Sequence, residues 1–282
     1  MTTTPGAAAD AARAAEDFLR AFHDRMPGRQ SKGAEAAPTR DGRTGYEVLA
    51  ERVAGARRVL DLGCADGALL ELLAGRGAET AGVDLSEGEL ALARLRPALA
   101  GADLRQGRAQ ELPFPDASFD AVVSHMALML MSDPDRVVAE AARVLAPGGT
   151  FAVAVGGGSV PGEAVELFLE VAVPYFRAAP PERRVPRLGD RRTRTREGLD
   201  GLLAPLGFAP LSWETVVMAM DGTPDEVWST LSGMFYDMEV LDEERTAQLR
   251  AEFLEHARAL AGPGGRIPCG MRVHVAAARL GR

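Results

Sequence analysis

Residues 58–70 read RVLDLGCADGALL, an apolar run that ends in an acidic residue and breaks into a turn of small residues. The pattern predicts a buried strand, a tight loop and the start of a helix. In an open α/β sheet such a loop lies at the carboxyl end of a strand, where the crevice that holds ligands forms. We therefore expect a binding site at residues 61–67, and the rest of the chain can be located relative to it.

The order of strand, loop and helix recurs along the chain. Apolar runs predict further strands at residues 80–83, 102–105, 119–124, 150–155, 208–220 and 272–276. Between them, Ser86 can cap a helix, with Glu89 three positions later completing a capping box, and Pro134 fits the first turn of another helix. This alternation predicts an α/β fold, a doubly wound, mostly parallel sheet of seven strands covered by helices.

Several segments lie outside this alternation. Residues 1–43 are predicted to form an amino-terminal helix, at 7–26, followed at 27–43 by a polar loop or lid rich in glycine and proline. Residues 44–282 are predicted to form the main domain, with cap insertions at 156–197 and 221–264. In the first insertion, Pro174 is expected to interrupt a helix that starts near residue 163.

Composition narrows the classes of partner. The 282 residues carry a net charge of -8, which argues against a general nucleic-acid surface. Cys64 and Cys269 supply no disulfide framework or metal cluster, and no metal site is predicted. The amino terminus lacks the pattern of a secretory signal, and no apolar run reaches the roughly 18 to 20 residues of a membrane helix. We expect a cytoplasmic protein that acts on a small molecule, with no nucleic-acid or membrane partner.

The residues of the first loop indicate the kind of ligand. Their spacing departs from the dinucleotide fingerprint, and Asp61 at the strand end would repel a pyrophosphate but suits an ammonium group. Gly63 and Gly67 would let the backbone come close to the ligand, and Asp84, which ends the next strand, can accept hydrogen bonds from two ribose hydroxyls. A cationic amino acid joined to a nucleoside describes S-adenosylmethionine.

With these residues the chain resembles the class I S-adenosylmethionine-dependent methyltransferases, of the small-molecule, quinone-methylating and natural-product type. Four motifs carry the resemblance in the right order, at residues 59–67, 82–86, 111–120 and 143–149. The resemblance implies an antiparallel last strand and S-adenosylmethionine as cofactor. It also implies a set of cofactor-binding residues: Tyr46, Asp61, Gly63, Cys64, Ala65, Gly67, Asp84, Leu85, Arg108, Ala109, Gln110 and Ser124.

Two residues depart from the family pattern. Ala65 stands where the family usually has a glycine, which is tolerable if the backbone there keeps φ below zero. Arg108 stands where an aspartate usually contacts the adenine amino group, so that group would need another partner, such as Gln110 or water, or Arg108 would stack on the ring.

The acceptor side is less defined. His125 follows the fourth strand and can act as a general base or only line the cavity. His23 can also reach the substrate, although a surface position is the favoured interpretation. Methionines at 126, 129 and 131 can form a soft apolar wall. The arginines at 177, 183, 184, 187, 191, 192, 194 and 196 can bind an anionic acceptor group, but a solvated loop is favoured.

The function predicted from these features is methyl transfer from S-adenosylmethionine to O, N or C of a small, apolar metabolite, such as a natural-product intermediate. The alternative is a methyltransferase-fold scaffold or cyclase that binds the cofactor without methyl transfer. A nicotinamide dehydrogenase is disfavoured by the glycine spacing and by Asp61. The residues do not indicate an oligomeric state, and a homodimer stays open.

Overall fold

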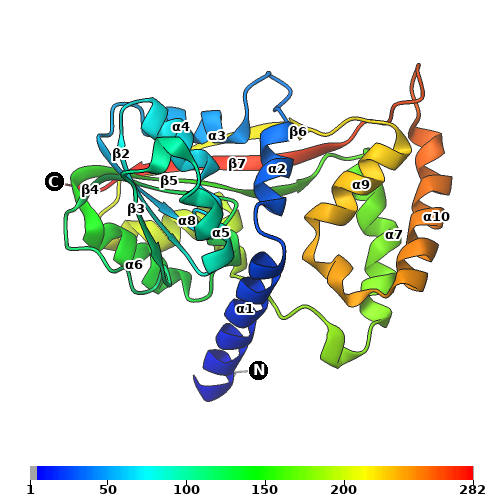
Figure 1. The fold of residues 1–282 in the computed structure, drawn as a ribbon, viewed down its shortest axis with the longest axis horizontal. Helices are drawn as coiled ribbons and strands as arrows, with labels where there is room; N and C mark the ends of the chain where they lie inside the picture. Colours follow the sequence, from blue (N-terminus) through cyan, green and yellow to red (C-terminus); the bar gives the residue numbers. More distant parts are fainter. Residues whose placement is uncertain (1–4, 282) are drawn as a thin grey trace.

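A computed structural model describes residues 5–281, and these contain one sheet of seven strands (Figure 1). The strands are β1 Arg58–Leu62, β2 Glu79–Asp84, β3 Asp103–Gln106, β4 Phe119–His125, β5 Leu145–Ser159, β6 Ser212–Ala219 and β7 Gly270–Arg279. Their order is β3-β2-β1-β4-β5-β7-β6. Strands β1 to β5 pair in parallel, and β7 runs antiparallel to both β5 and β6. The predicted fold class and the antiparallel last strand are confirmed.

Helices cover both faces of the sheet. The helices α3 Gly45–Glu51 and α4 Ala68–Gly75 pack their apolar side chains on one face, and α6 Pro134–Val144 and α8 Arg196–Leu203 pack on the other. Helix α5 Glu87–Ala93 packs beside α4 in a smaller cluster with Leu70 and Leu90. Short 3-10 helices are η1 Pro97–Leu99, η2 Leu128–Leu130, η3 Pro181–Arg183, η4 Arg191–Arg194, η5 Ala204–Leu206, η6 Tyr236–Val240 and η7 Arg258–Leu260.

The segments predicted as two insertions contribute helices to one packed group. Helices α7 Ala164–Ala178, α9 Pro224–Met234 and α10 Glu243–Ala257 share an apolar core that includes Phe168, Trp228 and Phe253. They stand beside the carboxyl ends of the parallel strands (Figure 1). We call this helical group the cap.

Pro174 does not interrupt its helix, contrary to the prediction. Helix α7 continues through it to Ala178. Pro174 and Glu170 lie on the exposed face of the helix, so the Glu170 carbonyl that loses its partner faces water. The opposite face packs in the cap core, which holds the helix together across the proline.

The amino-terminal segment corrects a second prediction. Residues 5–25 form the expected helix, α1 Pro5–Arg25, but the predicted loop at 27–43 contains a helix, α2 Arg29–Ala36. Its polar composition gave no helical signal. Helix α2 contacts α3 and α9, and Ser31 on it is only 4% exposed, so tertiary contacts hold it between the sheet domain and the cap.

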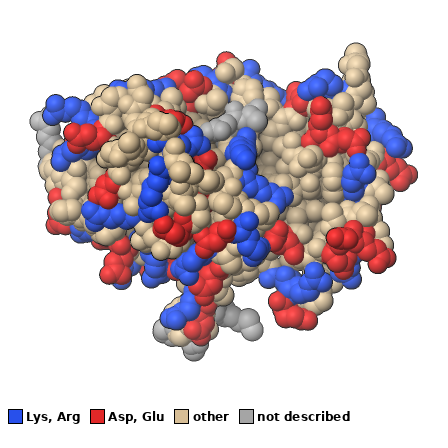
Figure 2. Space-filling model, in the orientation of Figure 1, with Lys and Arg blue, Asp and Glu red and all other residues tan. Residues whose placement is uncertain are grey.

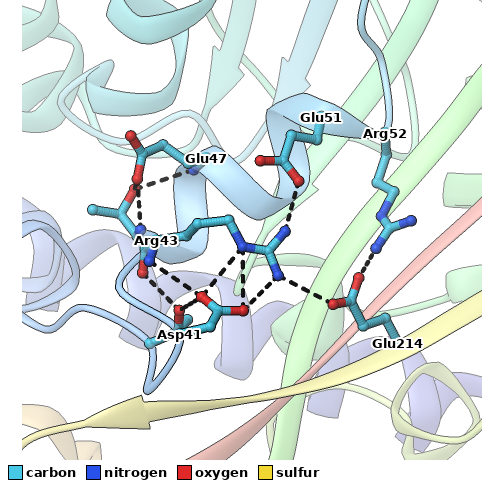
Figure 3. Close-up of polar contacts among 8 residues, drawn as sticks. Asp41, Arg43, Glu47, Glu51, Arg52 and Glu214 are labelled. Carbon is cyan, nitrogen blue, oxygen red and sulfur yellow. Dashed lines mark hydrogen bonds and ion pairs between the residues drawn. The ribbon is translucent and has the colours of Figure 1, made fainter.

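A cluster of charged side chains fixes the chain after α2 (Figure 3). Arg43 bonds to the carboxylates of Asp41, Glu51 and Glu214, and Arg52 also pairs with Glu214 on β6. The Thr44 side chain and Glu47 form a capping box at the start of α3. This network ties the start of α3 to β6. On the face shown in Figure 2, positive and negative side chains are interspersed.

Candidate active site

A cavity of about 1040 Å³ lies at the carboxyl ends of the parallel strands. Its walls come from the loops after β1, β2 and β4, from α1 and α2, and from the cap. Small-ligand pockets are usually about 300 to 1,000 Å³, so there is room for a cofactor and an acceptor together. All but two of the predicted cofactor residues line this cavity; the two are Gly67 and Ser124.

Two carboxylates, the buried Asp61 and the half-buried Asp84, lie on the side of the cavity next to β1 and β2. Asp61 is 2% exposed, and its Oδ1 has no hydrogen-bond partner among the described residues. Burial raises the pKa of Asp61 to about 8. Burial also raises the pKa of Asp84, which accepts hydrogen bonds from the backbone N–H groups of Ala65 at 2.9 Å and Ser86 at 2.8 Å. The site thus offers unsatisfied acceptors to a ligand that carries positive charge and donors.

The loop after β1 follows a left-handed path. Gly63, Ala65 and Gly67 all have positive φ, at 73°, 46° and 80°. The condition under which an alanine at position 65 would be tolerated without strain, a φ below zero, is therefore not met. Ala65 adopts the left-handed conformation because its N–H must turn toward Asp84, which costs a residue with a Cβ about 1 kcal/mol.

The two glycines serve protein packing more than ligand approach. A Cβ on Gly63 would lie 2.4 Å from the Cβ of Ala127, and one on Gly67 would lie 2.5 Å from a methyl of Leu99. Gly67 is the residue before α4 and does not line the cavity. Its predicted role in contacting the cofactor is therefore not supported by its position.

Ser124 is also displaced from its predicted role. It is fully buried, donates its hydroxyl proton to the Leu62 carbonyl and accepts from the Leu128 N–H. These bonds tie β4 to the end of β1 and leave the hydroxyl away from the cavity. Ser124 shapes the site only by holding two of its walls together.

Arg108 forms a pair that the sequence did not reveal. Its guanidinium donates to Glu16 Oε1 on α1 at 2.7 Å, and the Ser132 hydroxyl donates to the same oxygen at 2.7 Å. Glu16 is 9% exposed and lines the cavity beside Arg108. Arg108, in the loop after β3, therefore holds a carboxylate from α1 in the cavity. The spacing of Glu16, Leu19 and His23 along one helical face is the signal that could have found it.

The remaining predicted cofactor residues surround this pair. Cys64, Leu85 and Ala109 line the same region, with Ala109 and Cys64 largely buried. The Gln110 amide donates to the carbonyl and the hydroxyl of Ser132, so its side chain is already engaged. Tyr46, at the start of α3, lies across the cavity against His125.

His125 lies at the end of β4 and lines the cavity, as predicted. The centroids of its ring and the Tyr46 ring are 4.4 Å apart, and its Nε2 is buried without a hydrogen-bond partner in the described part of the chain. Burial lowers the pKa of His125 to about 4. The imidazole is therefore neutral near pH 7 and can accept a hydrogen bond.

His23 is not a surface residue. Its Nδ1 lies 2.9 Å from Glu89 Oε1, and its Nε2 lies 3.0 Å from the Tyr236 hydroxyl of the cap. Since a carboxylate only accepts, the tautomer with the proton on Nδ1 fits, and Tyr236 then donates to Nε2. Glu89 also accepts from the Gly28 N–H, so its side chain does not complete the predicted capping box, although the Ser86 cap forms.

The acceptor side of the cavity is apolar. Met126, Met129 and Met131 line it as expected, and further methionines from β6, β7 and the cap join them at positions 218, 220, 234 and 271. Phe235 and Tyr236 also face it, whereas Trp228 packs inside the cap core and Trp213 lies against His274. These distant methionines carried no sequence signal because they are isolated in the chain.

Other potential sites are absent from the described residues. Residues 5–281 hold no group of three or more His, Cys, Asp or Glu side chains placed to bind a metal ion, and Cys64 and Cys269 are both free. None of the helices in this range has the length and apolar character needed to cross a membrane.

Comparison with known proteins agrees with this site. The family model described as "Methyltransferase domain" matches residues 60–153, which carry β1, β2 and β4. The chain is 42% identical over 97 residues to a fatty-acid O-methyltransferase of Mycolicibacterium smegmatis, covering 34% of this chain and 35% of the relative. It is 42% identical over 95 residues to a ubiquinone biosynthesis O-methyltransferase of Hahella chejuensis, covering 33% and 40%. The matches thus span well under half of either relative.

A solved structure supports the fold. The phosphoethanolamine N-methyltransferase 2 of Haemonchus contortus, in complex with S-adenosyl-L-methionine, superposes with a TM-score of 0.55 at 18% identity, covering 94% of this chain and 60% of that one. Identity this low supports only the fold. The similarity to a methyltransferase domain rests on the family model that matches residues 60–153. Residues 60–153 are therefore similar to methyltransferase domains, and the seven-stranded sheet that contains them has the fold of the class I S-adenosylmethionine-dependent methyltransferases.

Proposed function

We propose that this protein transfers the methyl group of S-adenosylmethionine to an oxygen atom of a small, apolar metabolite. The observation that carries the proposal is the pair of carboxylates that line the cavity, the buried Asp61 with its unpartnered Oδ1 and the half-buried Asp84, within the segment that matches the methyltransferase domain. The two O-methyltransferases named above motivate the choice of oxygen, although a phosphatidylethanolamine N-methyltransferase of Cereibacter sphaeroides matches at similar identity, 41% over 100 residues.

The residues present fit this cofactor. Asp61 would accept from the ammonium group of its amino-acid part, and Asp84, already oriented by two backbone N–H groups, would accept from the ribose hydroxyls. Leu85 and Ala109 would border the adenine. Glu16 would accept from the adenine amino group, since Arg108 holds its carboxylate in the cavity. When bound, the cofactor supplies an electrophilic methyl group on a sulfonium.

The other residues of the cavity would orient the acceptor. His125 is neutral at pH 7 and lines the cavity beside Tyr46, so its ring would border the acceptor and help to hold the oxygen in line. The burial that lowers the pKa of His125 also makes it a weak base, so we assign it to orientation first and to proton removal second. The methionine wall would bind the apolar body of the acceptor.

The remaining predictions from the sequence stay proposals. We propose a cytoplasmic enzyme of natural-product or quinone-type metabolism, without a nucleic-acid partner. As domain organisation we propose an amino-terminal helix and lid at residues 1–43 and a main domain at residues 44–282. The main domain carries cap insertions at 156–197 and 221–264. The scaffold or cyclase alternative is not favoured, because the matched family and both relatives are methyltransferases.

The test uses calorimetry and mass spectrometry on the full chain. Wild-type protein is expected to bind S-adenosylmethionine, and Asp84→Asn is expected to weaken binding by about tenfold or more because a charge-assisted hydrogen bond is lost. Asp103→Asn, on the exposed edge strand β3, is the matched control and should bind as wild type. Incubation with a metabolite extract should give a product heavier by one methylene and S-adenosylhomocysteine. Absence of cofactor binding by the wild-type protein would refute the proposal.

A further inference from the structure

The structure separates the eight arginines of residues 177–196 into different environments. Arg192 pairs with Asp135 and Asp190, and Arg184 donates to the carbonyls of Arg177 and Ala179. Most of the others are exposed to water. Only Arg187 and Arg194 of this segment line the cavity, and Arg187 is exposed at its rim. Arg194 is the half-buried member of the set that faces the cavity.

Arg194 is held on a fixed element. It ends η4, where Thr193 is fully buried and donates its hydroxyl proton to the Asp190 carbonyl. The Asp190 side chain caps the start of the same 3-10 helix. The element contacts β5 and η2, so its last residue is directed to the end of β5. The backbone of η4 therefore fixes the position of the Arg194 guanidinium next to the cavity.

The residues that surround the Arg194 guanidinium are apolar. A Cβ built on Gly156 would lie 3.4 Å from Arg194 Nη1 and 3.4 Å from the Met129 sulfur. Gly156 therefore lies within contact range of both the guanidinium and the methionine wall. Arg194 has no ion pair and no hydrogen bond to any residue within 5–281, although an arginine carries five donors.

Electrostatics set Arg194 apart from the other arginines. Neighbouring carboxylates raise the pKa of Arg43, Arg108 and Arg192, whereas burial alone lowers the pKa of Arg194. The side chain stays charged, because an arginine pKa is above about 12. A half-buried charge without a counter-ion is costly, and an anion brought by a ligand would relieve that cost.

We propose that the acceptor carries an anionic oxyacid group, a carboxylate or a phosphate monoester, that is held by Arg194 while its apolar body lies against Met126 and Met129. The inference rests on the proposed function and names the class of its acceptor. The guanidinium fork matches two oxygens of either group. The cofactor side of the cavity is lined by the acidic side chains of Glu16, Asp61 and Asp84, which offer an anion no attraction, so the anion would be held by Arg194, a half-buried cavity cation without a carboxylate partner within residues 5–281.

The experiment measures binding of three probes by calorimetry, with S-adenosylhomocysteine present at saturation and each probe below its micelle concentration. The probes are decanoate, decyl phosphate and the uncharged decanamide. Wild-type protein is expected to bind at least one anionic probe tenfold or more tightly than decanamide. The variant Arg194→Met should lose that preference and keep its affinity for decanamide. The affinity for decanoate compared with that for decyl phosphate shows whether the anionic group is a carboxylate or a phosphate monoester.

Arg191→Met is the matched control, because Arg191 lies on the same 3-10 helix, is exposed and does not line the cavity. It should bind all probes as wild type does. Arg194→Lys keeps the charge without the fork, and an intermediate preference for the anion is expected. Equal affinity of wild-type protein for decanamide and both anions, or an unchanged preference in Arg194→Met, would overturn the proposal. Binding of S-adenosylhomocysteine by each variant is recorded first, so failure of the cofactor site is distinguished from failure of this inference.

Discussion

Replacement of Asp61 by asparagine is expected to stabilise the protein without ligand and to weaken cofactor binding. Asp61 is buried and its Oδ1 has no partner in the described chain, so its ionised form is disfavoured and its pKa is raised to about 8. The pKa of an aspartate in an unfolded chain is about 3.9. Asparagine has the same shape as the protonated aspartate and cannot ionise.

The sign of the pH dependence follows from the two pKa values. Because the folded pKa lies above the unfolded one, the folded protein holds one more proton between about pH 4 and pH 8. The free energy of unfolding of wild-type protein therefore falls as pH rises through this window, by about 1.4 kcal/mol per pH unit for one proton. Between pH 5 and pH 7 the advantage of Asp61→Asn should grow by about 3 kcal/mol.

Urea unfolding of wild type, Asp61→Asn and the exposed control Asp103→Asn at pH 5, 6 and 7 measures this difference. All titrating groups except the replaced aspartate are common to wild type and each variant, so their contributions cancel in each comparison with wild type. Calorimetry at pH 8 should show Asp61→Asn binding S-adenosylmethionine about 30-fold more weakly, since a hydrogen bond between two charged groups is worth about 2 kcal/mol. A stability difference that does not change with pH would refute the assigned environment of Asp61. Unchanged cofactor affinity would refute its role in binding.

Three further predictions concern the walls of the cavity. Ala65→Gly should raise the free energy of unfolding by about 0.5 to 1 kcal/mol because it relieves the left-handed backbone at φ 46°, whereas Ala91→Gly on the exposed face of α5 should lower it by a similar amount, both measured by urea unfolding. Glu16→Gln should reduce by about tenfold the preference for S-adenosylhomocysteine over S-inosylhomocysteine, which lacks the adenine amino group; an unchanged preference in calorimetry would exclude Glu16 as its acceptor. Tyr236→Phe removes the hydroxyl that reaches His23 and should lower the thermal midpoint by a few degrees, a loss of about 1 kcal/mol; an unaltered midpoint would mean that this bond does not hold the cap.

The sheet and the cofactor side of the cavity were predictable because their signals are local. An apolar run, an acidic residue at its end and small residues in the turn all fall within residues 58–67, and the same order returns at residues 80–86. In a parallel sheet the carboxyl ends of neighbouring strands lie at one edge, so Asp61 and Asp84 were expected close together. The local backbone was less predictable, since the choice of left-handed φ at Ala65 depends on the hydrogen bond to Asp84.

The walls built by α1 and the cap were not predictable in the same way. The pair of Glu16 with Arg108 and the contact of His23 with Tyr236 join residues that are 92 and 213 positions apart. Helical spacing places Glu16 and His23 on one face of α1, but no period or motif in the sequence links that face to Arg108 or Tyr236. Helix α2 was missed for a related reason, because its stability comes from the helices on either side and not from its own sequence.

The two halves of the cavity are related by one electrostatic principle. On the cofactor side, Asp61 is buried and Asp84 is half-buried, and neither forms an ion pair with a residue within 5–281. Their desolvation lowers the stability of the protein without ligand, and a cationic ligand would offset that cost. On the acceptor side, Arg194 is half-buried and has no carboxylate partner within residues 5–281, so its desolvation lowers the stability of the protein in the same way. A ligand pair in which the cofactor is cationic and the acceptor anionic would satisfy both groups, and each would attract its ligand to the correct half. We therefore expect the protein to gain more stability from both ligands together than from an uncharged acceptor with the cofactor.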